Sequence, residues 1–96
     1  MQVIIDGRKI TDKLELHAYM KEQCQFPDYY GNNLDALYDV LTERAEPLEI
    51  CIEYAEELKE RLCGYGEAFL EMLQDVSANE SNVRVVIMEK HSSLEK

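Results

Sequence analysis

The apolar positions of this chain follow two different periods, which together predict seven secondary-structure elements. Short apolar or alternating runs, typical of strands, occupy residues 3–5, 48–53 and 83–88. Apolar residues spaced by three and four, typical of amphipathic helices, occupy segments near 12–24, 33–42, 55–62 and 66–76. Strands separated by helical crossovers favour a parallel sheet with right-handed connections. The expected fold is a two-layer α/β domain with a three-stranded parallel sheet and about four helices.

Capping residues place the helix starts more closely. Asp12 and Glu15 fit a capping box at the first helix, and Asn33 is the expected N-cap of the second, with Asn32 as the alternative. Gly31 is expected to supply a positive φ angle just before that helix. In the strand at 48–53, apolar residues alternate with Glu49, Cys51 and Glu53, which predicts one wetter face.

Length and composition predict one globular domain. The chain has 96 residues, of which 46% are hydrophobic and 31% charged. We expect a single domain over residues 1–90 and a flexible C-terminal tail over 91–96. No window holds eighteen apolar residues, and the N-terminus reads as a strand rather than a signal peptide, so a cytoplasmic location is expected.

The formal net charge of −10 narrows the classes of partner. Such a surface repels nucleic acid and the anionic leaflet of a membrane, and attracts a basic protein. Solubility alone would also account for the charge. The three cysteines contain no CxxC pair, so each is expected to be a reduced, buried, small hydrophobe. The two histidines, His17 and His91, are far apart in sequence, so no metal or other cofactor is expected.

The second helix divides into faces on a 3.6-residue wheel. Asp35 and Asp39 share one flank, with Thr42 one turn beyond and Tyr38 at the border of the buried stripe. Like charges at i and i+4 weaken a helix by a few tenths of a kcal/mol. The helix dipole favours Asp35 in the first turn but not Asp39, which indicates that something other than helix stability keeps Asp39 there.

Three interpretations of this flank compete. It can be a solvated acidic face, a carboxylate pair for acid–base catalysis, or a protein-binding surface in which aromatics anchor and carboxylates pair with arginines. No nucleophile–base pair or metal ligand set accompanies the carboxylates. The nearby Tyr29, Tyr30 and Tyr38 favour protein binding, although one of the adjacent tyrosines should turn inward.

Other charged or polar residues are expected to be structural. His17 is read as a packed or capping histidine. The residues expected to form solvent-facing charge are Glu53, Glu56, Glu57, Glu60, Glu67 and Glu71.

Leu16-His17 and the later run PDYYGNNLDALYDVL at residues 27–41 resemble the barstar family of intracellular ribonuclease inhibitors. The resemblance implies an α/β domain without catalytic activity that binds a basic, secreted, barnase-like ribonuclease or a related nuclease toxin and blocks its active site. It implies that the interface is lined by Tyr29, Gly31, Asn33, Asp35, Asp39 and Thr42.

The resemblance also assigns roles to single residues. Asp39 would take the place of a substrate phosphate, and Asp35 would pair with an arginine. Tyr38 stands where the best-known member has tryptophan, and Glu43 where it has glycine. Asp75 corresponds to a further acidic contact on the fourth helix.

Two other functions stay open at this point. The chain can be a barstar-like module for a different toxin or regulatory partner, or a small hydrolase that uses Asp35 and Asp39.

Overall fold

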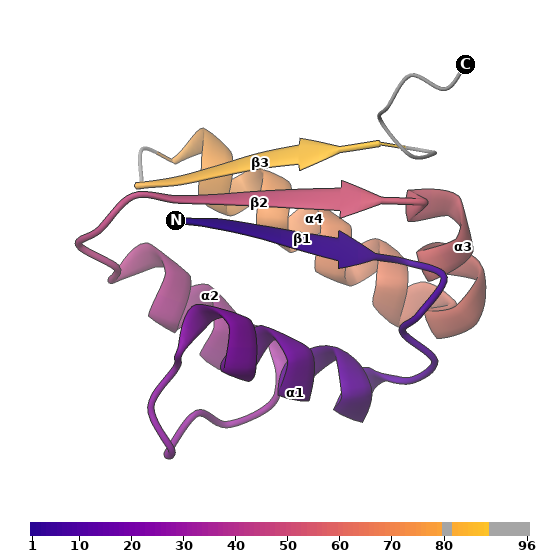
Figure 1. Cartoon of the computed structure of the whole chain (residues 1–96), viewed down its shortest axis with the longest axis horizontal. Coiled ribbons are helices and arrows are strands. Elements are labelled where there is room, and N and C mark those ends of the chain that lie inside the picture. The colour runs from indigo at the N-terminus through magenta and orange to yellow at the C-terminus, as the bar shows by residue number, and fades with distance from the viewer. Residues whose placement is uncertain (80–81, 89–96) are drawn as a thin grey trace.

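The computed structural model describes residues 1–79 and 82–88. Three parallel strands lie side by side in the order β1-β2-β3, and the register places Val3 beside Ile50 and Ile50 beside Val85. Figure 1 shows the sheet and its helices. The elements along the chain are β1 (Gln2–Asp6), α1 (Lys13–Cys24), α2 (Leu34–Thr42), β2 (Leu48–Glu53), α3 (Ala55–Leu62), α4 (Gly64–Ala78) and β3 (Val83–Ile87). The predicted α/β fold with a three-stranded parallel sheet is confirmed.

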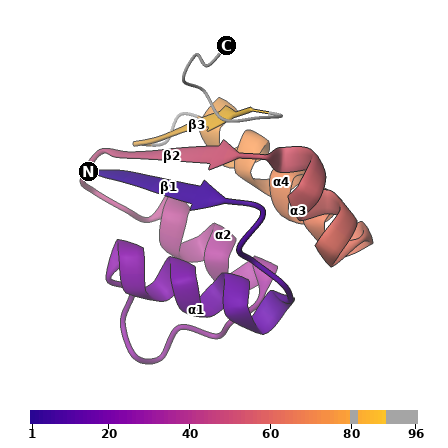
Figure 2. The same ribbon diagram turned by 45° about the vertical axis from the view of Figure 1, so that its right-hand side comes forward.

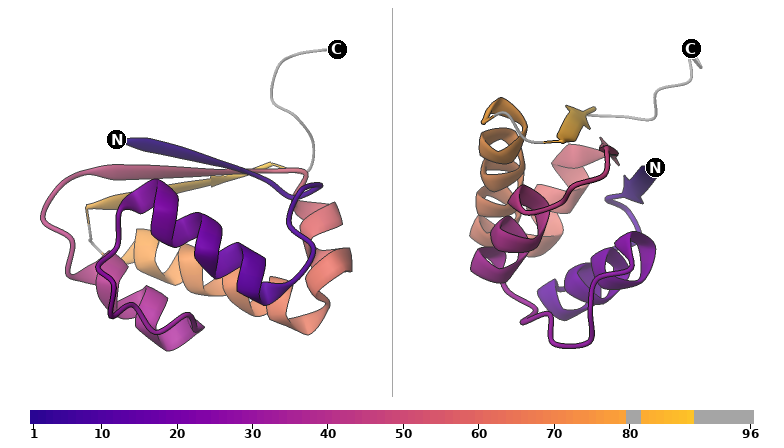
Figure 3. Two further views of the ribbon diagram at one scale, coloured as in Figure 1. Left: turned by 60° about the horizontal axis from the view of Figure 1, so that its bottom comes forward. Right: turned by 90° about the vertical axis from the view of Figure 1, so that its left-hand side faces the viewer.

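The described helices lie on one side of the sheet, as Figure 3 shows, so the molecule has two layers. The residues of β1 and β2 that face them, such as Val3 and Ile50, are buried, and Phe69 of α4 is fully buried beneath the sheet. The predicted tail at 91–96 lies outside the described residues, and the single domain over 1–90 stays a prediction.

The face of β2 that carries Cys51 and Glu53 is less exposed to solvent than the alternating pattern predicted. Cys51 and Glu53 are each only 8% exposed. Cys51 is buried because β2 is the central strand, with Ile4 and Val86 as its neighbours in register. Glu53 ends β2 opposite Asp6, so it is enclosed at the end of the sheet. The prediction that Glu53 faces solvent is therefore wrong.

Local chemistry sets the ends of α1. The backbone N–H of Glu15 donates to Asp12 Oδ1 at 2.8 Å, as predicted for an N-cap. The return half of the box differs, because Glu15 Oε1 accepts from the N–H and the hydroxyl of Thr11, both at 2.7 Å. These hydrogen bonds lower the pKa of Glu15. At the other end, Gln25 adopts a left-handed conformation with φ 60°.

The junction between α3 and α4 is tighter than predicted. Helix α4 begins at Gly64 rather than Gly66, and Cys63 alone separates the two helices with φ 56° and ψ −135°. Cys63 is exposed there, whereas Cys24 and Cys51 are buried. The expectation that all three cysteines are buried is wrong for Cys63, because a one-residue connection between two helices leaves its side chain in solvent.

Candidate partner-binding surface

The loop between α1 and α2 lies at the end of the molecule farthest from the sheet, as Figure 2 shows. Its two adjacent tyrosines have opposite environments: Tyr29 is 85% exposed and Tyr30 is 5% exposed. The ring of Tyr30 packs on Phe26 with centroids 4.9 Å apart, and its N–H donates to Pro27 O at 3.0 Å. Burial raises the pKa of Tyr30. One tyrosine therefore anchors the loop and the other projects from it, as predicted.

The turn before α2 is built by asparagines. Asn32, with φ 59°, adopts the left-handed conformation that the sequence assigned to Gly31. The physical reason is that asparagine tolerates this region better than other residues with a Cβ, so Gly31 is not required for it. Asn33 caps α2, because its Oδ1 accepts from Ala36 N at 2.8 Å and its Nδ2 donates to Gly31 O at 3.2 Å. The predicted cap is confirmed, and it fixes the loop to the helix.

Packing of α2 against α4 turns the acidic flank outward. Leu37 and Leu41 are fully buried, whereas Asp35 and Asp39 are exposed. Within residues 1–79 and 82–88, no lysine or arginine lies within 4.0 Å of either carboxylate. Both carboxylates can therefore accept hydrogen bonds from a cationic partner. Tyr38 is 36% exposed at the edge of the same flank.

Two residues of the predicted site are less available than the carboxylates or lie apart from them. The hydroxyl of Thr42 donates to the backbone carbonyl of Tyr38 at 2.9 Å, so only its lone pairs can serve a partner. Asp75 is exposed near the end of α4, where its backbone carbonyl accepts from Asn79 N. It lines neither of the grooves beside α2 described below.

Two shallow grooves border α2, and each is lined by one of its two aspartates. One, of about 260 Å³, is lined by Tyr29, Tyr30, Gly31, Ala36, Asp39, Val40 and Glu43. The other, of about 380 Å³, is lined by Lys13, Asn32, Asn33, Leu34, Asp35 and Tyr65. Sequence reasoning missed Lys13 and Tyr65, which reach the site from α1 and α4 through long-range packing. No local motif could have indicated them.

His17 lies behind this surface and is 1% exposed. Its Nδ1 is 2.6 Å from the hydroxyl oxygen of Tyr30, and its Nε2 is 2.6 Å from that of Tyr65. Burial, and secondarily the charge of Lys13, lower the pKa of His17. The prediction of a packed histidine is confirmed, and the structure adds that its two nitrogens join the loop to α4.

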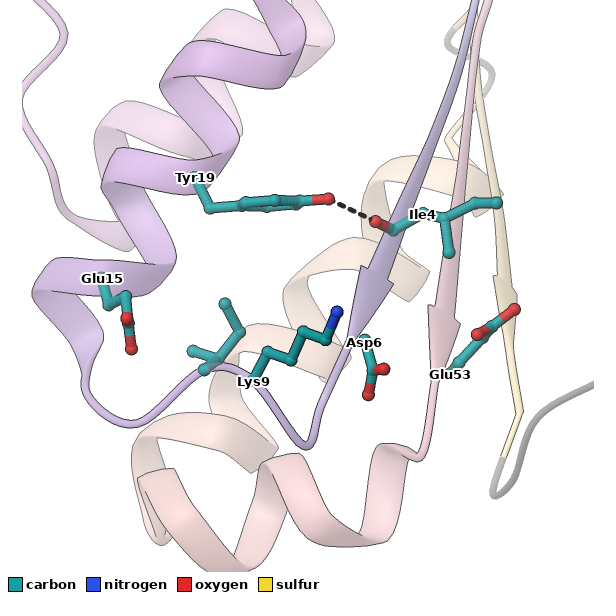
Figure 4. Close-up of a pocket in the computed structure, with 7 residues that line it drawn as sticks. Ile4, Asp6, Lys9, Glu15, Tyr19 and Glu53 are labelled. Atoms are coloured by element: carbon teal, nitrogen blue, oxygen red, sulfur yellow. Dashed lines mark hydrogen bonds between the residues drawn. The ribbon is translucent and has the colours of Figure 1, made fainter.

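A larger hollow, of about 470 Å³, lies between β1 and α1, and Figure 4 shows its lining. There the hydroxyl of Tyr19 donates to Ile4 O at 2.7 Å, so this carbonyl on the edge of the sheet already has a hydrogen-bond donor. Asp6 is paired with Arg8 at 2.8 Å, and Glu15 caps the start of α1. These carboxylates already have partners, so the α2 flank remains the candidate site.

Residues 1–79 and 82–88 contain neither a cluster of metal ligands nor a membrane-spanning helix. No three histidine, cysteine, aspartate or glutamate side chains are close enough together to hold a metal ion. None of the helices found there has the length and apolar character needed to span a bilayer.

Comparison with known proteins gives the family. The family model described as "Barstar (barnase inhibitor)" matches residues 1–88. The chain is also 36% identical over 89 residues to the Bacillus subtilis (strain 168) protein named "Putative ribonuclease inhibitor YrdF", covering 92% of this chain and 98% of that protein. The family-model match extends over all three strands and the α2 surface. The chain belongs to the barstar family.

Proposed function

We propose that this protein is an intracellular inhibitor of a basic, barnase-like ribonuclease, and that it is not itself an enzyme. The observation that carries the proposal is the exposed flank of α2, where Asp35 and Asp39 have no cationic partner among the described residues. Tyr29, which is 85% exposed, lines the same groove as Asp39. Membership in the barstar family and the name of the Bacillus subtilis relative support the same function.

In this proposal α2 and the preceding loop enter the nuclease cleft. Asp39 occupies the position of a substrate phosphate among the basic groups of the enzyme, and Asp35 pairs with an arginine. Tyr29 packs on the rim of the cleft, and Gly31 allows close approach of the backbone. Asn33, Tyr38, Thr42 and Asp75 complete the proposed interface.

The net charge of −10 favours encounter with a basic enzyme. The attraction between exposed charges is screened by salt. Association should therefore slow as the ionic strength rises.

A second candidate function is supported by one residue. Glu43 lines the same groove as Tyr29 and Asp39, so a further negative charge borders the proposed contact. A partner with an additional cation at that position would be favoured over barnase-like enzymes in general. This candidate is a barstar-like module for a different toxin or a regulatory protein.

The test is inhibition of a basic barnase-like ribonuclease by Asp39→Ala, with Glu60→Ala as a control that removes an equal charge from an exposed position on α3. Removing one partner of a buried charge pair costs about 3–5 kcal/mol. The dissociation constant of Asp39→Ala should therefore rise roughly a hundredfold to several thousandfold, and that of Glu60→Ala little. Equal inhibition by parent and Asp39→Ala would exclude the mechanism. Absence of inhibition by the parent would favour the second candidate.

A further inference from the structure

The ring of His17 connects three segments that are far apart in sequence. The ring lies on α1 and contacts the hydroxyl of Tyr30 in the loop between α1 and α2, here called the partner-binding loop. It also contacts the hydroxyl of Tyr65 in the first turn of α4, and both contacts are 2.6 Å long. Tyr30 directly follows the projecting Tyr29. One imidazole ring thus connects the loop to α4, whose Tyr65 lines the groove that contains Asp35.

The two hydrogen bonds of the His17 ring determine which of its nitrogens carries the proton. Tyr30 is 5% exposed, and His17 Nδ1 is the hydrogen-bond partner of its hydroxyl among the described residues. A buried hydroxyl hydrogen needs an acceptor, so Nδ1 must be the unprotonated nitrogen and must accept from Tyr30. Nε2–H then donates to the hydroxyl oxygen of Tyr65. Tyr65 is only half-buried, so its hydroxyl hydrogen can be donated to water. The neutral ring therefore satisfies all three side chains.

A second proton disrupts this arrangement. An imidazolium carries hydrogen on both nitrogens, so Nδ1–H would face the O–H of Tyr30, and that hydroxyl would have to turn toward the apolar interior. The titratable groups that face the ring are Lys13 from α1, Tyr30 from the loop and Tyr65 from α4. The ammonium of Lys13 lies 5.3 Å from the centroid of the Tyr65 ring and opposes a further positive charge. Among the described residues, no carboxylate forms an ion pair with the ring.

We propose that the Tyr30–His17–Tyr65 chain is a proton-sensitive latch, which holds the partner-binding loop in place at neutral pH and releases it in acid. The latch is a property of the free protein. Only its consequence, weaker binding of the partner in acid, rests on the proposed function.

Linkage gives the size of the effect. In the released loop the ring is hydrated and titrates near 6.5, the ordinary value for histidine. In the latched state, burial lowers the pKa of the ring, so protonation favours the released state. The released state should therefore gain up to about tenfold in population between pH 7.5 and pH 5.5, the limit for a latched ring that stays neutral throughout this range, which lies above the range in which ordinary carboxylates titrate.

The first test measures hydrogen exchange in the free protein. The N–H of Tyr30, bonded to Pro27 O at 3.0 Å, reports on the loop, and that of Ile50 in β2 serves as an internal reference. After correction for intrinsic rates, protection at Tyr30 should be lower than at Ile50, which reports global unfolding, and it should fall by up to about tenfold from pH 7.5 to 5.5. Equal protection at Tyr30 and Ile50 would mean that the loop opens only when the whole domain unfolds, and would overturn the latch. His17→Gln should remove the pH dependence. His91→Gln, which removes the other histidine, should behave as the parent.

A second variant guards against loss of folding in His17→Gln. Tyr65→Phe keeps the contact between His17 and Tyr30 but removes the second anchor, so loop protection should already be lower at pH 7.5. Protection at Tyr30 that is independent of pH in the parent would overturn the latch, as would an equal fall in His17→Gln. So would a Tyr65→Phe loop as protected as the parent's.

The second test separates the latch from the proposed function. Dissociation of the complex with a basic barnase-like ribonuclease should accelerate between pH 7.5 and 5.5 for the parent, and less for His17→Gln. If no complex forms at either pH, the proposed function fails while the exchange data still decide the latch. If the loop opens in acid but dissociation is equally fast in parent and variant, the regulatory consequence is overturned.

Discussion

Replacing Cys63 by glycine should stabilise the protein, because this residue connects two helices in a conformation that a Cβ atom disfavours. With φ 56° and ψ −135°, Cys63 lies in a region that glycine enters freely and other residues rarely adopt. Its thiol is exposed and makes one weak contact, 3.8 Å from the carbonyl oxygen of Glu60. Little packing is therefore lost when the side chain is removed.

The magnitude follows from two opposing effects. A residue held in a sparsely populated region of φ/ψ space costs about 1–3 kcal/mol. Glycine, by contrast, raises the conformational entropy of the unfolded chain, which lowers stability by about 0.4–1 kcal/mol. The expected net gain for Cys63→Gly is about 1 kcal/mol, which corresponds to about 4–8 °C in Tm for a domain of this size.

Urea unfolding of the parent, Cys63→Gly and Cys63→Ala measures this effect under reducing conditions. Alanine removes the thiol but keeps the Cβ atom, so Cys63→Ala should match the parent within about 0.5 kcal/mol. A gain in Cys63→Gly alone assigns the effect to the backbone. If Cys63→Gly is no more stable than Cys63→Ala, the argument from strain is refuted.

Three further outcomes are expected from the free protein. Gly7→Ala should lower the free energy of unfolding by about 1–3 kcal/mol, measured in urea, because an added Cβ would lie 2.3 Å from Tyr54 O. Asn33→Ala should cost about 1 kcal/mol in the same assay, since the bond to Ala36 N is lost, and an unchanged midpoint would contradict its role as a cap. Because the pKa of His17 is lower in the folded than in the unfolded chain, the unfolded chain takes up a proton first as pH falls. Stability that is fully present above about pH 6.5 should therefore decline below it, and a flat urea midpoint between pH 7.5 and 5.5 would contradict this.

The helix starts were predictable from sequence because capping is local chemistry. The side chains of Asp12 and Asn33 each reach an amide three residues ahead, and both caps are present. The assignment of positive φ to Gly31 failed for an equally local reason. Asparagine and glycine both tolerate the left-handed region, and the sequence does not say which of two adjacent residues adopts it.

What the sequence could not predict depends on tertiary neighbours. Glu53 reads as a surface residue, but it is buried because it ends the central strand, and the order of strands is not contained in any local pattern. The contact between His17 and Tyr65 joins residues 48 positions apart. The groove lined by Tyr65 and Asp35 also depends on tertiary packing, because its residues come together only when α1, α2 and α4 pack against one another.

The buried residues that stabilise α2 and the carboxylates of the proposed binding surface lie on opposite sides of the helix. Leu37 and Leu41 are fully buried, and each contributes about 1.5–3 kcal/mol through burial. The repulsion between Asp35 and Asp39 costs only a few tenths of a kcal/mol, and the helix dipole offsets part of it at Asp35 alone. The leucines therefore hold the helix while the carboxylates stay exposed and without a cation among the described residues. A helix selected for stability alone would carry a lysine or arginine one turn from Asp39. In the proposed complex, a cation of the ribonuclease takes that place.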